Sequence, residues 1–311
     1  MCSKPKYIIA SSILALCFFV SCNSSSSLLT TGVATTPYFF VSNFLAGNIT
    51  SCKINSDGTA SPCQTTGTGL TGPFGVARNK ANNFIYISDY SSGDVIFCHE
   101  TESGLLSNCA TARSGFTSPG GISFNSSGSI AYVTDYNANA VFYCPVAVDG
   151  TFSGCTNTGT LFHLPYRIAL NATDTHAYIS SFSTNSIVLC SVNVNGSLSS
   201  CTNSGATSVT FPVGVTINPA KNKLYIANDN GGTPPYVIYC TINGDGSLSS
   251  CQDAGVSTAS TSASVTFNSS GTIAYVSDLS TVYKCDVAGS GNFTNCSQTG
   301  SNFSYPTDLS F

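Results

Sequence analysis

The sequence contains no tryptophan, one methionine at its start, and only 8% charged residues. Typical soluble domains carry about 25% charged residues; here Ser, Thr, Asn and Gly take their place. Acidic residues outnumber basic ones by 14 to 10, and no run of Lys or Arg forms a basic stripe. We therefore expect no binding to nucleic acid. The apolar fraction of 42% is enough for a folded core, which argues against a disordered chain.

Residues 1–21 have the pattern of a signal peptide. A short basic start with Lys4 and Lys6 precedes an apolar run, 7–20, that is too short for a comfortable membrane span. The segment FVSC at 19–22 resembles the bacterial lipobox and predicts lipidation of Cys22; simple cleavage of a secretory signal is the alternative. Residues 22–37 are expected to form a Ser/Thr-rich tether. The mature protein is thus predicted to be exported from a bacterial cell, to the periplasm, the outer membrane or the outside, touching a membrane only through an N-terminal lipid.

Twelve of the 15 cysteines form a regular repeat. Partners are eleven positions apart, and the pairs recur every 45–50 residues. The pairs are Cys52/Cys63, Cys98/Cys109, Cys144/Cys155, Cys190/Cys201, Cys240/Cys251 and Cys285/Cys296. A period of this length is typical of four-stranded β-propeller blades. One disulfide per blade is predicted, and zinc is disfavoured because CxxC-type spacing is absent.

A turn signal lies at the middle of each cysteine pair. Asp57-Gly58 occupies that point in the first pair, and Asp, Asn or Ser precedes Gly in the others. Such dipeptides favour a two-residue type I′ hairpin turn. The cysteines would then lie directly opposite each other, with Cα atoms about 4.5–5.5 Å apart, which a disulfide accepts. Counting from the turn gives a hydrogen-bonded pair, so a local bulge is compatible with this register.

The third repeat shows a complete blade, with strands a, b and c at 119–125, 130–135 and 140–144 and strand d reaching Cys155. An aromatic residue recurs in strand b and is expected to pack between blades. It is Phe40, Tyr86, Tyr132, Tyr178, Tyr225 and Tyr275 in the six repeats. The first repeat lacks strand a, and residues 305–311 form a lone a strand. The C-terminal strand should therefore close the ring, making residues 38–311 one all-β, six-bladed β-propeller.

Three recurring motifs resemble those of known repeat families. They are Pro-x-Gly-[Val/Ile], Tyr-[Ile/Val]-x-[Asp/Asn] and x-Gly-x-Leu-Ser. They are similar to YVTN, NHL and lactonase-type β-propeller repeats, and the resemblance covers nearly all of the mature chain. It implies the fold and leaves function open, since the relatives include lactonases, lyases, streptogramin-inactivating enzymes and interaction modules. Lactonase-type propellers usually have seven blades, and no catalytic motif from them can be placed here.

Departures from the repeat suggest the candidate site. The third position of Pro-x-Gly is small or acidic except at Arg167, and Arg167 and Asp308 belong to blades that face each other across the ring. Four b–c loops begin with an aromatic residue, and the blade-five b–c loop, 229–236, is longer than the others. We expect a ligand on the b–c and d–a loop face; packing between loops is the alternative role for these aromatics. The candidate ligand-binding residues are Tyr90, Tyr136, Tyr166, Arg167, Phe182, Asp308 and His163, the last being the one candidate base near the channel.

A polar residue recurs at the end of strand b and is expected to cap turns. It is Asn43, Asp89, Asp135, Ser181, Asn228 and Asp278 in the six repeats. No cofactor is expected, with a Ca²⁺ ion in the channel as the alternative. The function favoured by the sequence is a monomeric, non-catalytic binding module of the cell envelope with a protein or carbohydrate ligand. The alternative is a lactonase-like hydrolase or lyase that works in the central channel.

Overall fold

A computed structural model describes residues 38–159, 162–256 and 262–311. The predicted signal peptide, the tether and Cys22 lie outside these described residues. Within them the chain is all-β apart from one short 3-10 helix, η1 (Phe182–Thr184). No helix in the described part of the chain has the length and apolar character needed to cross a membrane.

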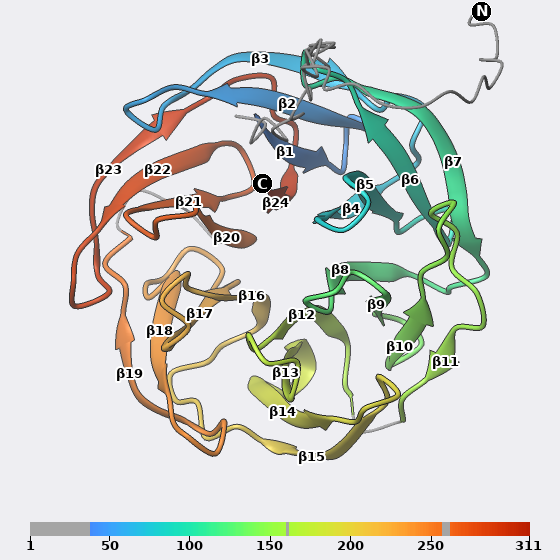
Figure 1. Ribbon diagram of the computed structural model, residues 1–311. Coiled ribbons are helices and arrows are strands. Elements are labelled where there is room, and N and C mark those ends of the chain that lie inside the picture. The colour runs from blue at the N-terminus through green and yellow to red at the C-terminus, as the bar shows by residue number, and fades with distance from the viewer. Residues whose placement is uncertain (1–37, 160–161, 257–261) are drawn as a thin grey trace, which may run out of the picture. The chain divides into compact units, whose positions relative to one another are not determined.

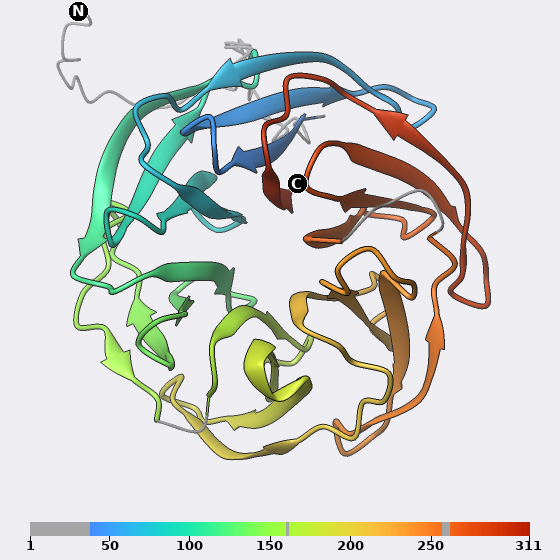
Figure 2. The same ribbon diagram turned by 180° about the vertical axis from the view of Figure 1, so that it is seen from behind.

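Six antiparallel sheets of four strands each surround a central axis, which confirms the predicted six-bladed β-propeller (Figure 1). Strand a of each blade is innermost and strand d is outermost. The a–b and c–d turns lie on the face seen in Figure 1. The b–c and d–a loops lie on the other face, which Figure 2 shows.

The strands, in the order a to d, have the following bounds. Blade one consists of β24 (Pro306–Ser310), β1 (Tyr38–Asn43), β2 (Asn48–Ile54) and β3 (Ala60–Thr66). Blade two consists of β4 (Pro73–Asn79), β5 (Phe84–Asp89), β6 (Asp94–Glu100) and β7 (Leu106–Ser114). Blade three consists of β8 (Pro119–Phe124), β9 (Ile130–Asp135), β10 (Ala140–Pro145) and β11 (Thr156–Asn157). Blade four consists of β12 (Pro165–Leu170), β13 (His176–Ser181), β14 (Ser186–Val192) and β15 (Leu198–Asn203). Blade five consists of β16 (Pro212–Ile217), β17 (Lys223–Asn228), β18 (Val237–Ile242) and β19 (Leu248–Asp253). Blade six consists of β20 (Ser264–Phe267), β21 (Ile273–Ser277), β22 (Val282–Val287) and β23 (Phe293–Thr299).

The c–d hairpins do not have the predicted two-residue type I′ turn. In blade one, the Asn55 N–H donates to the Thr59 carbonyl at 2.8 Å, and the Gly58 N–H donates to the Asn55 carbonyl at 2.9 Å. Gly58 has a left-handed φ of 81°, and Asp57 has no positive φ. The loop is therefore a type I turn followed by a left-handed glycine, a three-residue form. The type I′ prediction was wrong because the Asp57 carboxylate accepts the Thr59 N–H at 2.8 Å and so favours the longer loop.

All six predicted disulfides are present, and the Cα atoms of each pair lie 4.0–4.1 Å apart. The bridges join Cys52 to Cys63, Cys98 to Cys109, Cys144 to Cys155, Cys190 to Cys201, Cys240 to Cys251 and Cys285 to Cys296. Each closes a short loop and stabilises the fold by about 3 kcal/mol on the chain-entropy model. Six such bonds indicate an oxidising environment, periplasmic or extracellular.

In four blades the local bulge that the predicted register allowed falls at the cysteines themselves. In blade two Phe97 pairs with Ala110 and His99 with Ser107, so Cys98 and Cys109 fall at a shift of register and are not ladder partners. The same shift falls at the cysteines of blades four, five and six, whose outer members are Cys201, Cys251 and Cys296. Cys109, Cys201, Cys251 and Cys296 all form their predicted disulfides, with Cα distances of 4.0–4.1 Å, against 4.0 Å for the ladder pair Cys52–Cys63 in blade one.

A bulge with a left-handed residue causes this shift. The residue before the outer cysteine has a φ of 47–50° in these four blades, at Asn108, Ser200, Ser250 and Asn295. In blade one Cys52 does pair with Cys63, and the register shifts by one residue before Ile54 pairs with Ala60. An extra residue in one strand bends that strand and changes the local spacing. The bulge thus accounts for Cα distances shorter than a regular ladder predicts.

The two cysteines of each bridge differ in exposure. The inner cysteine, on strand c, is fully buried in every blade. The outer one lies in or beside strand d at the rim of the propeller, where Cys109 is exposed and Cys63, Cys155, Cys201, Cys251 and Cys296 are half-buried. The outer cysteine is therefore the member of each bridge that solvent reaches.

The recurring aromatic of strand b packs between blades, as predicted. Tyr132 is fully buried, and its Oη donates a hydrogen bond of 2.8 Å to the carbonyl of Gly196, in the hairpin of the next blade. The same bond joins Tyr86 to Gly150, Tyr178 to Gly246, Tyr225 to Gly291 and Tyr275 to Gly58. Blade one carries Phe40 instead, and there Tyr38 covers Gly104 of blade two. Five of the six junctions between neighbouring blades are thus joined by one tyrosine hydroxyl and one hairpin glycine.

The ring is closed by the C-terminal strand. β24 pairs antiparallel with β1, placing Leu309 opposite Val41, and Leu309 is 5% exposed. The inner strands of successive blades also contact one another around the axis, including β20 with β24 and β24 with β4. The chain therefore starts and ends its propeller within one blade, which confirms the predicted closure.

Candidate functional site

Arg167 extends from β12 of blade four across the central channel. Its Nη2 donates to the Thr307 carbonyl at 2.8 Å and to the Phe74 carbonyl at 3.2 Å, in blades one and two. Its Nε lies 3.5 Å from Oδ1 of Asp308, and its guanidinium lies 4.7 Å from the centre of the Phe74 ring. Arg167 and Asp308 are 6% and 7% exposed. The two charges that the sequence assigned to the channel therefore form a buried ion pair.

Asp308 has further partners on both sides of blade one. Its Oδ2 accepts the Val76 N–H of blade two at 3.0 Å, and its Oδ1 accepts the Ser264 hydroxyl of blade six at 2.8 Å. The carboxylate therefore connects the inner strands of three blades directly and a fourth through Arg167. An acceptor engaged in this way serves to hold the ring together.

The polar residues that end the b strands fix the d–a loops. Asp135 accepts the backbone N–H groups of Thr117 at 2.7 Å and Ser118 at 2.8 Å, and Asp89 accepts that of Thr71 at 2.7 Å. Asp89 and Asp135 are 2% and 1% exposed. These contacts are those of the expected turn caps. Across the residues that the structure places, no group of three or more His, Cys, Asp or Glu is arranged to hold a metal ion.

Eight aromatic side chains form a continuous layer on the b–c and d–a loop face, which we call the aromatic floor. Its members are Phe44, Phe74, Tyr90, Tyr136, Tyr166, Phe182, Phe211 and Tyr305. Neighbouring rings have centroids 4.8–6.4 Å apart and planes inclined by 36–89°. The structure thus brings the candidates Tyr90, Tyr136, Tyr166 and Phe182 together. They are partly buried, because each ring packs against the next.

Phe211 and Tyr305 form the exposed rim of the floor, and sequence reasoning missed them. They are 42% and 37% exposed, and their φ angles are 44° and 56°. A left-handed φ is uncommon for bulky residues. Each directly precedes the proline that begins a strand a, Pro212 or Pro306. An aromatic residue before the Pro-x-Gly signature is the signal that would have identified them.

The tyrosines at the centre of the floor are neutral hydroxyls at physiological pH. Burial raises the pKa of Tyr166 well above its ordinary value, and the neighbouring Tyr136 hydroxyl raises it further. Burial likewise raises the pKa of Tyr136. The floor therefore offers a contacting molecule apolar ring surface with uncharged polar tips, and its cation, Arg167, is already paired.

A small cavity of ≈ 70 Å³ opens beside Arg167 and is lined in part by Tyr166, Asp229 and Tyr305. Asp229 begins the long blade-five loop, whose last residue, Tyr236, is 7% exposed and donates its hydroxyl to a carbonyl of the same loop at 2.9 Å. The irregular loop is therefore folded onto itself, with Asp229 as its contribution to the cavity. The cavity has room for a small side chain.

His163, the one candidate base near the channel, lies on an exposed d–a loop and is absent from the lining of this cavity. Its backbone N–H donates to Ser181 Oγ at 3.3 Å. Among the described residues its ring has no hydrogen-bond partner, whereas a catalytic base is ordinarily oriented by a third group. The structure therefore does not join His163 to Arg167 and Asp308.

Solved structures with similar folds include several of different function. No family model and no curated protein matches the sequence. A chain of a nidogen/laminin complex is 13% identical, with a TM-score of 0.65 over 88% of this chain and 97% of that one. The periplasmic gluconolactonase of Pseudomonas aeruginosa is 13% identical, with a TM-score of 0.62 over 85% and 80%. A Bacteroides fragilis protein provisionally assigned as a 6-phosphogluconolactonase is 12% identical, with a TM-score of 0.62 over 89% and 98%. At these identities the likeness shows the propeller fold alone.

Proposed function

We propose that the protein is a non-catalytic binding module whose ligand is a segment of another protein, held on the aromatic floor. The observation that carries this proposal is the continuous layer of eight aromatic rings with an exposed rim at Phe211 and Tyr305. Aromatic residues are enriched at the centres of protein interfaces and dominate their binding energy. Rigid rings also lose little conformational entropy on binding. The site would act outside the cytoplasm, on the cell envelope if Cys22 is lipidated.

The geometry of the rings favours a protein over a carbohydrate. A sugar ring stacks on an aromatic face that lies open and flat. In the floor the planes of adjacent rings are inclined by 36° or more, so that edges and faces alternate. Leu45, which is 71% exposed and follows Phe44, extends the apolar surface beyond the rings. Such a surface fits apolar side chains of a peptide, one of which would enter the small cavity beside Arg167.

A library of random peptides displayed on phage, selected against the purified protein, tests this proposal. Selected peptides should lose about 5–30-fold in affinity for Phe211→Ala and for Tyr305→Ala, the loss expected of an aromatic hot spot. Val148→Ala is the matched control, because Val148 is 99% exposed on the c–d hairpin of blade three, on the opposite face. Equal affinity of the peptides for the wild type and both floor variants would contradict the proposal. The melting temperatures of all variants should stay close to that of the wild type.

A second candidate function is hydrolysis of a lactone. It is favoured by the fold likeness to the gluconolactonase of Pseudomonas aeruginosa and to the provisionally assigned 6-phosphogluconolactonase. Purified protein, before and after addition of Ca²⁺ or Zn²⁺, is assayed for opening of glucono-δ-lactone above the spontaneous rate. Metal-dependent turnover would show that the protein is an enzyme and would contradict the non-catalytic function. A rate of lactone opening equal to the spontaneous rate would support the binding module.

A further inference from the structure

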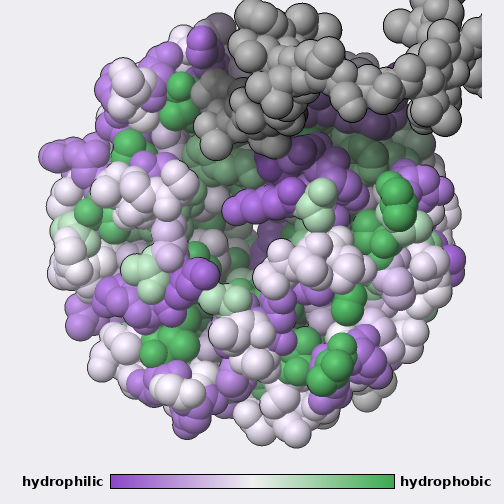
Figure 3. All heavy atoms as spheres, viewed as in Figure 1, coloured by the Kyte–Doolittle hydropathy of each residue, from purple (hydrophilic) through white to green (hydrophobic). Residues whose placement is uncertain are grey.

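The channel widens into a funnel on the face opposite the aromatic floor, where the a–b turns lie. Two cavities of ≈ 390 Å³ and ≈ 440 Å³ hollow this mouth, and Lys80, Thr266 and Phe267 line both of them. Figure 3 shows the hollow at the centre of this face, with hydrophilic residues reaching over it. Sites for small molecules are typically about 300–1,000 Å³, so the funnel has the size of a ligand site.

The charged side chains that line the funnel are all cationic. Lys80 and Lys221 stand exposed on the a–b turns of blades two and five, which are opposite one another in a ring of six. Neither lysine has an ion-pair partner among the residues that the structure describes. The third cation of the lining, Arg78, is neutralised by a buried ion pair with Glu100. No Asp or Glu side chain lines either cavity in the described part of the chain.

The a–b turn of blade four carries an acidic side chain, Asp174, which is already engaged. Asp174 of blade four accepts the backbone N–H of Ser126 at 2.9 Å and its hydroxyl at 2.5 Å. The net charge of the whole chain is −4, whereas the unpaired charged side chains of the funnel are two lysines. Charges of one sign in a cleft with low-dielectric walls concentrate the field and attract ions of the opposite sign.

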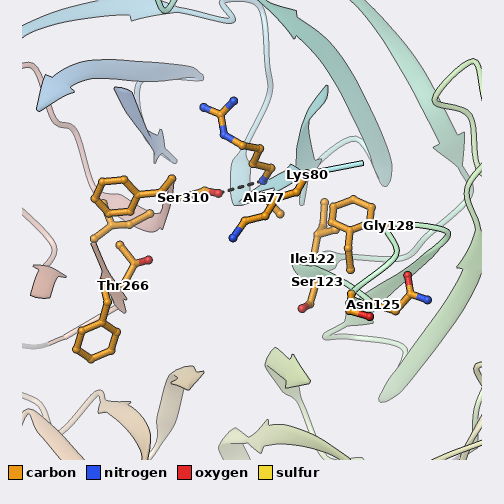
Figure 4. A pocket seen from close by; sticks show the side chains of 14 residues that line it. Ala77, Lys80, Ile122, Ser123, Asn125, Gly128, Thr266 and Ser310 are labelled. Atoms are coloured by element: carbon orange, nitrogen blue, oxygen red, sulfur yellow. Dashed lines mark hydrogen bonds between the residues drawn. The ribbon is translucent and has the colours of Figure 1, made fainter. Parts of the chain in front are cut away.

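Hydroxyl groups surround the space that the lysines face. They stand at the same position of strand a in four blades, as Ser123, Thr216, Thr266 and Ser310. Figure 4 shows the Lys80 side chain pointing into the space between Ser123, Thr266 and Ser310. Half-buried Phe124 adds apolar surface to the same lining, whereas Phe267 is 8% exposed and packs mainly into the core. The funnel therefore combines cationic donors, neutral donors and flat apolar surface.

We propose that the funnel is a binding site for a small organic anion that carries a phosphate or carboxylate group on a flat or apolar body. The anionic group lies between Lys80 and Lys221, which donate charge-assisted hydrogen bonds, the stronger kind. The hydroxyls of the inner strands complete its contacts, and the body of the ligand packs against Phe124. This site uses no residue of the aromatic floor. Its test is therefore independent of the proposed protein-binding function.

Isothermal titration calorimetry with phenyl phosphate and with inorganic phosphate, at low ionic strength, tests the proposal. Phenyl phosphate should bind saturably at one site per chain, and inorganic phosphate should bind more weakly because it lacks the apolar body. The double variant Lys80→Ala/Lys221→Ala should weaken phenyl phosphate binding at least tenfold. Lys53→Ala is the control for loss of positive charge, because Lys53 is exposed on β2, away from the cavity linings, and it should bind as the wild type does.

Three results would overturn the proposal in whole or in part. Absence of saturable binding of either anion to the wild type would remove the site, as would equal affinities of the double variant and of Lys53→Ala. If inorganic phosphate bound as tightly as phenyl phosphate, the funnel would be a site for inorganic anions, and the proposal of an organic ligand would be wrong. Both lysines are exposed, so their removal should leave the melting temperature unchanged and the comparison valid.

Discussion

Removing Asp308 should destabilise the propeller far more than removing an exposed charge. Arg167 would stay buried at 6% exposure without its counter-ion, and the Val76 N–H and the Ser264 hydroxyl would lose their acceptor. Breaking a buried pair from one side costs about 3–5 kcal/mol, so we expect a loss of this size for Asp308→Ala. Arg167→Met should cost a similar amount, because it leaves Asp308 buried with a charge and frees two channel carbonyls.

The double variant Arg167→Met/Asp308→Ala separates the ion pair from these other contacts. Because it removes both charges, its loss should be smaller than the sum of the single losses by about 1–3 kcal/mol. The measurement is urea unfolding at pH 7 with the disulfides intact, followed by circular dichroism. In a thermal scan a loss of about 3 kcal/mol lowers the melting temperature by roughly 6–12 °C.

Asp286→Ala is the control for this cycle. Its side chain is 46% exposed and lies 3.7 Å from Lys284, so its removal should cost less than about 1 kcal/mol. Strictly additive losses in the cycle, or a loss for Asp308→Ala no larger than for Asp286→Ala, would show that Asp308 does not hold Arg167 across the channel. Arg167 would then be free to act as a ligand-binding cation, as the sequence suggested.

Three further changes have definite expected outcomes. Replacing Cys144 and Cys155 by Ala should lower the free energy of urea unfolding by about 3 kcal/mol while keeping the fold. Peptide mapping of the wild type without reduction should show that every disulfide joins cysteines eleven positions apart, and a disulfide between blades would contradict the blade register. Deleting residues 304–311 should prevent folding, since it removes β24, the Asp308 contacts and the partner of β1; a monomeric product with an unchanged melting temperature would speak against closure by this strand. Burial raises the pKa of Tyr132, Tyr178 and Tyr275 from 10.0 to about 12, so the stabilisation by these neutral hydroxyls is complete below pH 10 and is lost as the pH rises towards 12. Urea midpoints measured over this pH range should therefore fall, and they should fall less steeply in Tyr132→Phe. Constant midpoints would contradict the raised pKa of these tyrosines.

The repeat made the fold predictable. Cysteines at a fixed spacing of eleven positions, an aromatic in every strand b and a lone a strand at the C-terminus determine the blades, their number and their closure. The turn type was not predictable, because Asp57-Gly58 suits both a two-residue and a three-residue loop. Its choice depends on the hydrogen bond from Thr59 to the Asp57 side chain. The exact position of the bulge beside Cys109 was not predictable either, because it depends on a left-handed backbone at Asn108.

The candidate site was predictable only where a residue occupies a repeated position. Tyr90, Tyr136 and Phe182 begin b–c loops in register and were found together. Phe211 and Tyr305 lie on separate d–a loops, and their contact with the other rings depends on a left-handed backbone that the sequence does not display. The ion pair of Arg167 with Asp308 depends on how far one side chain reaches across the channel. The lysines of the funnel had no distinguishing pattern, since each stands alone on an ordinary turn.

Photo-cross-linking shows directly whether a ligand contacts the aromatic floor. The photoreactive residue p-benzoylphenylalanine replaces Phe211 in one variant and Val148, on the opposite face, in another. Each variant is irradiated with a peptide selected from the display library, and the products are identified by mass spectrometry. We expect a cross-link from position 211 and none from position 148. Cross-linking from position 148 alone, or equally from both positions, would contradict this expectation.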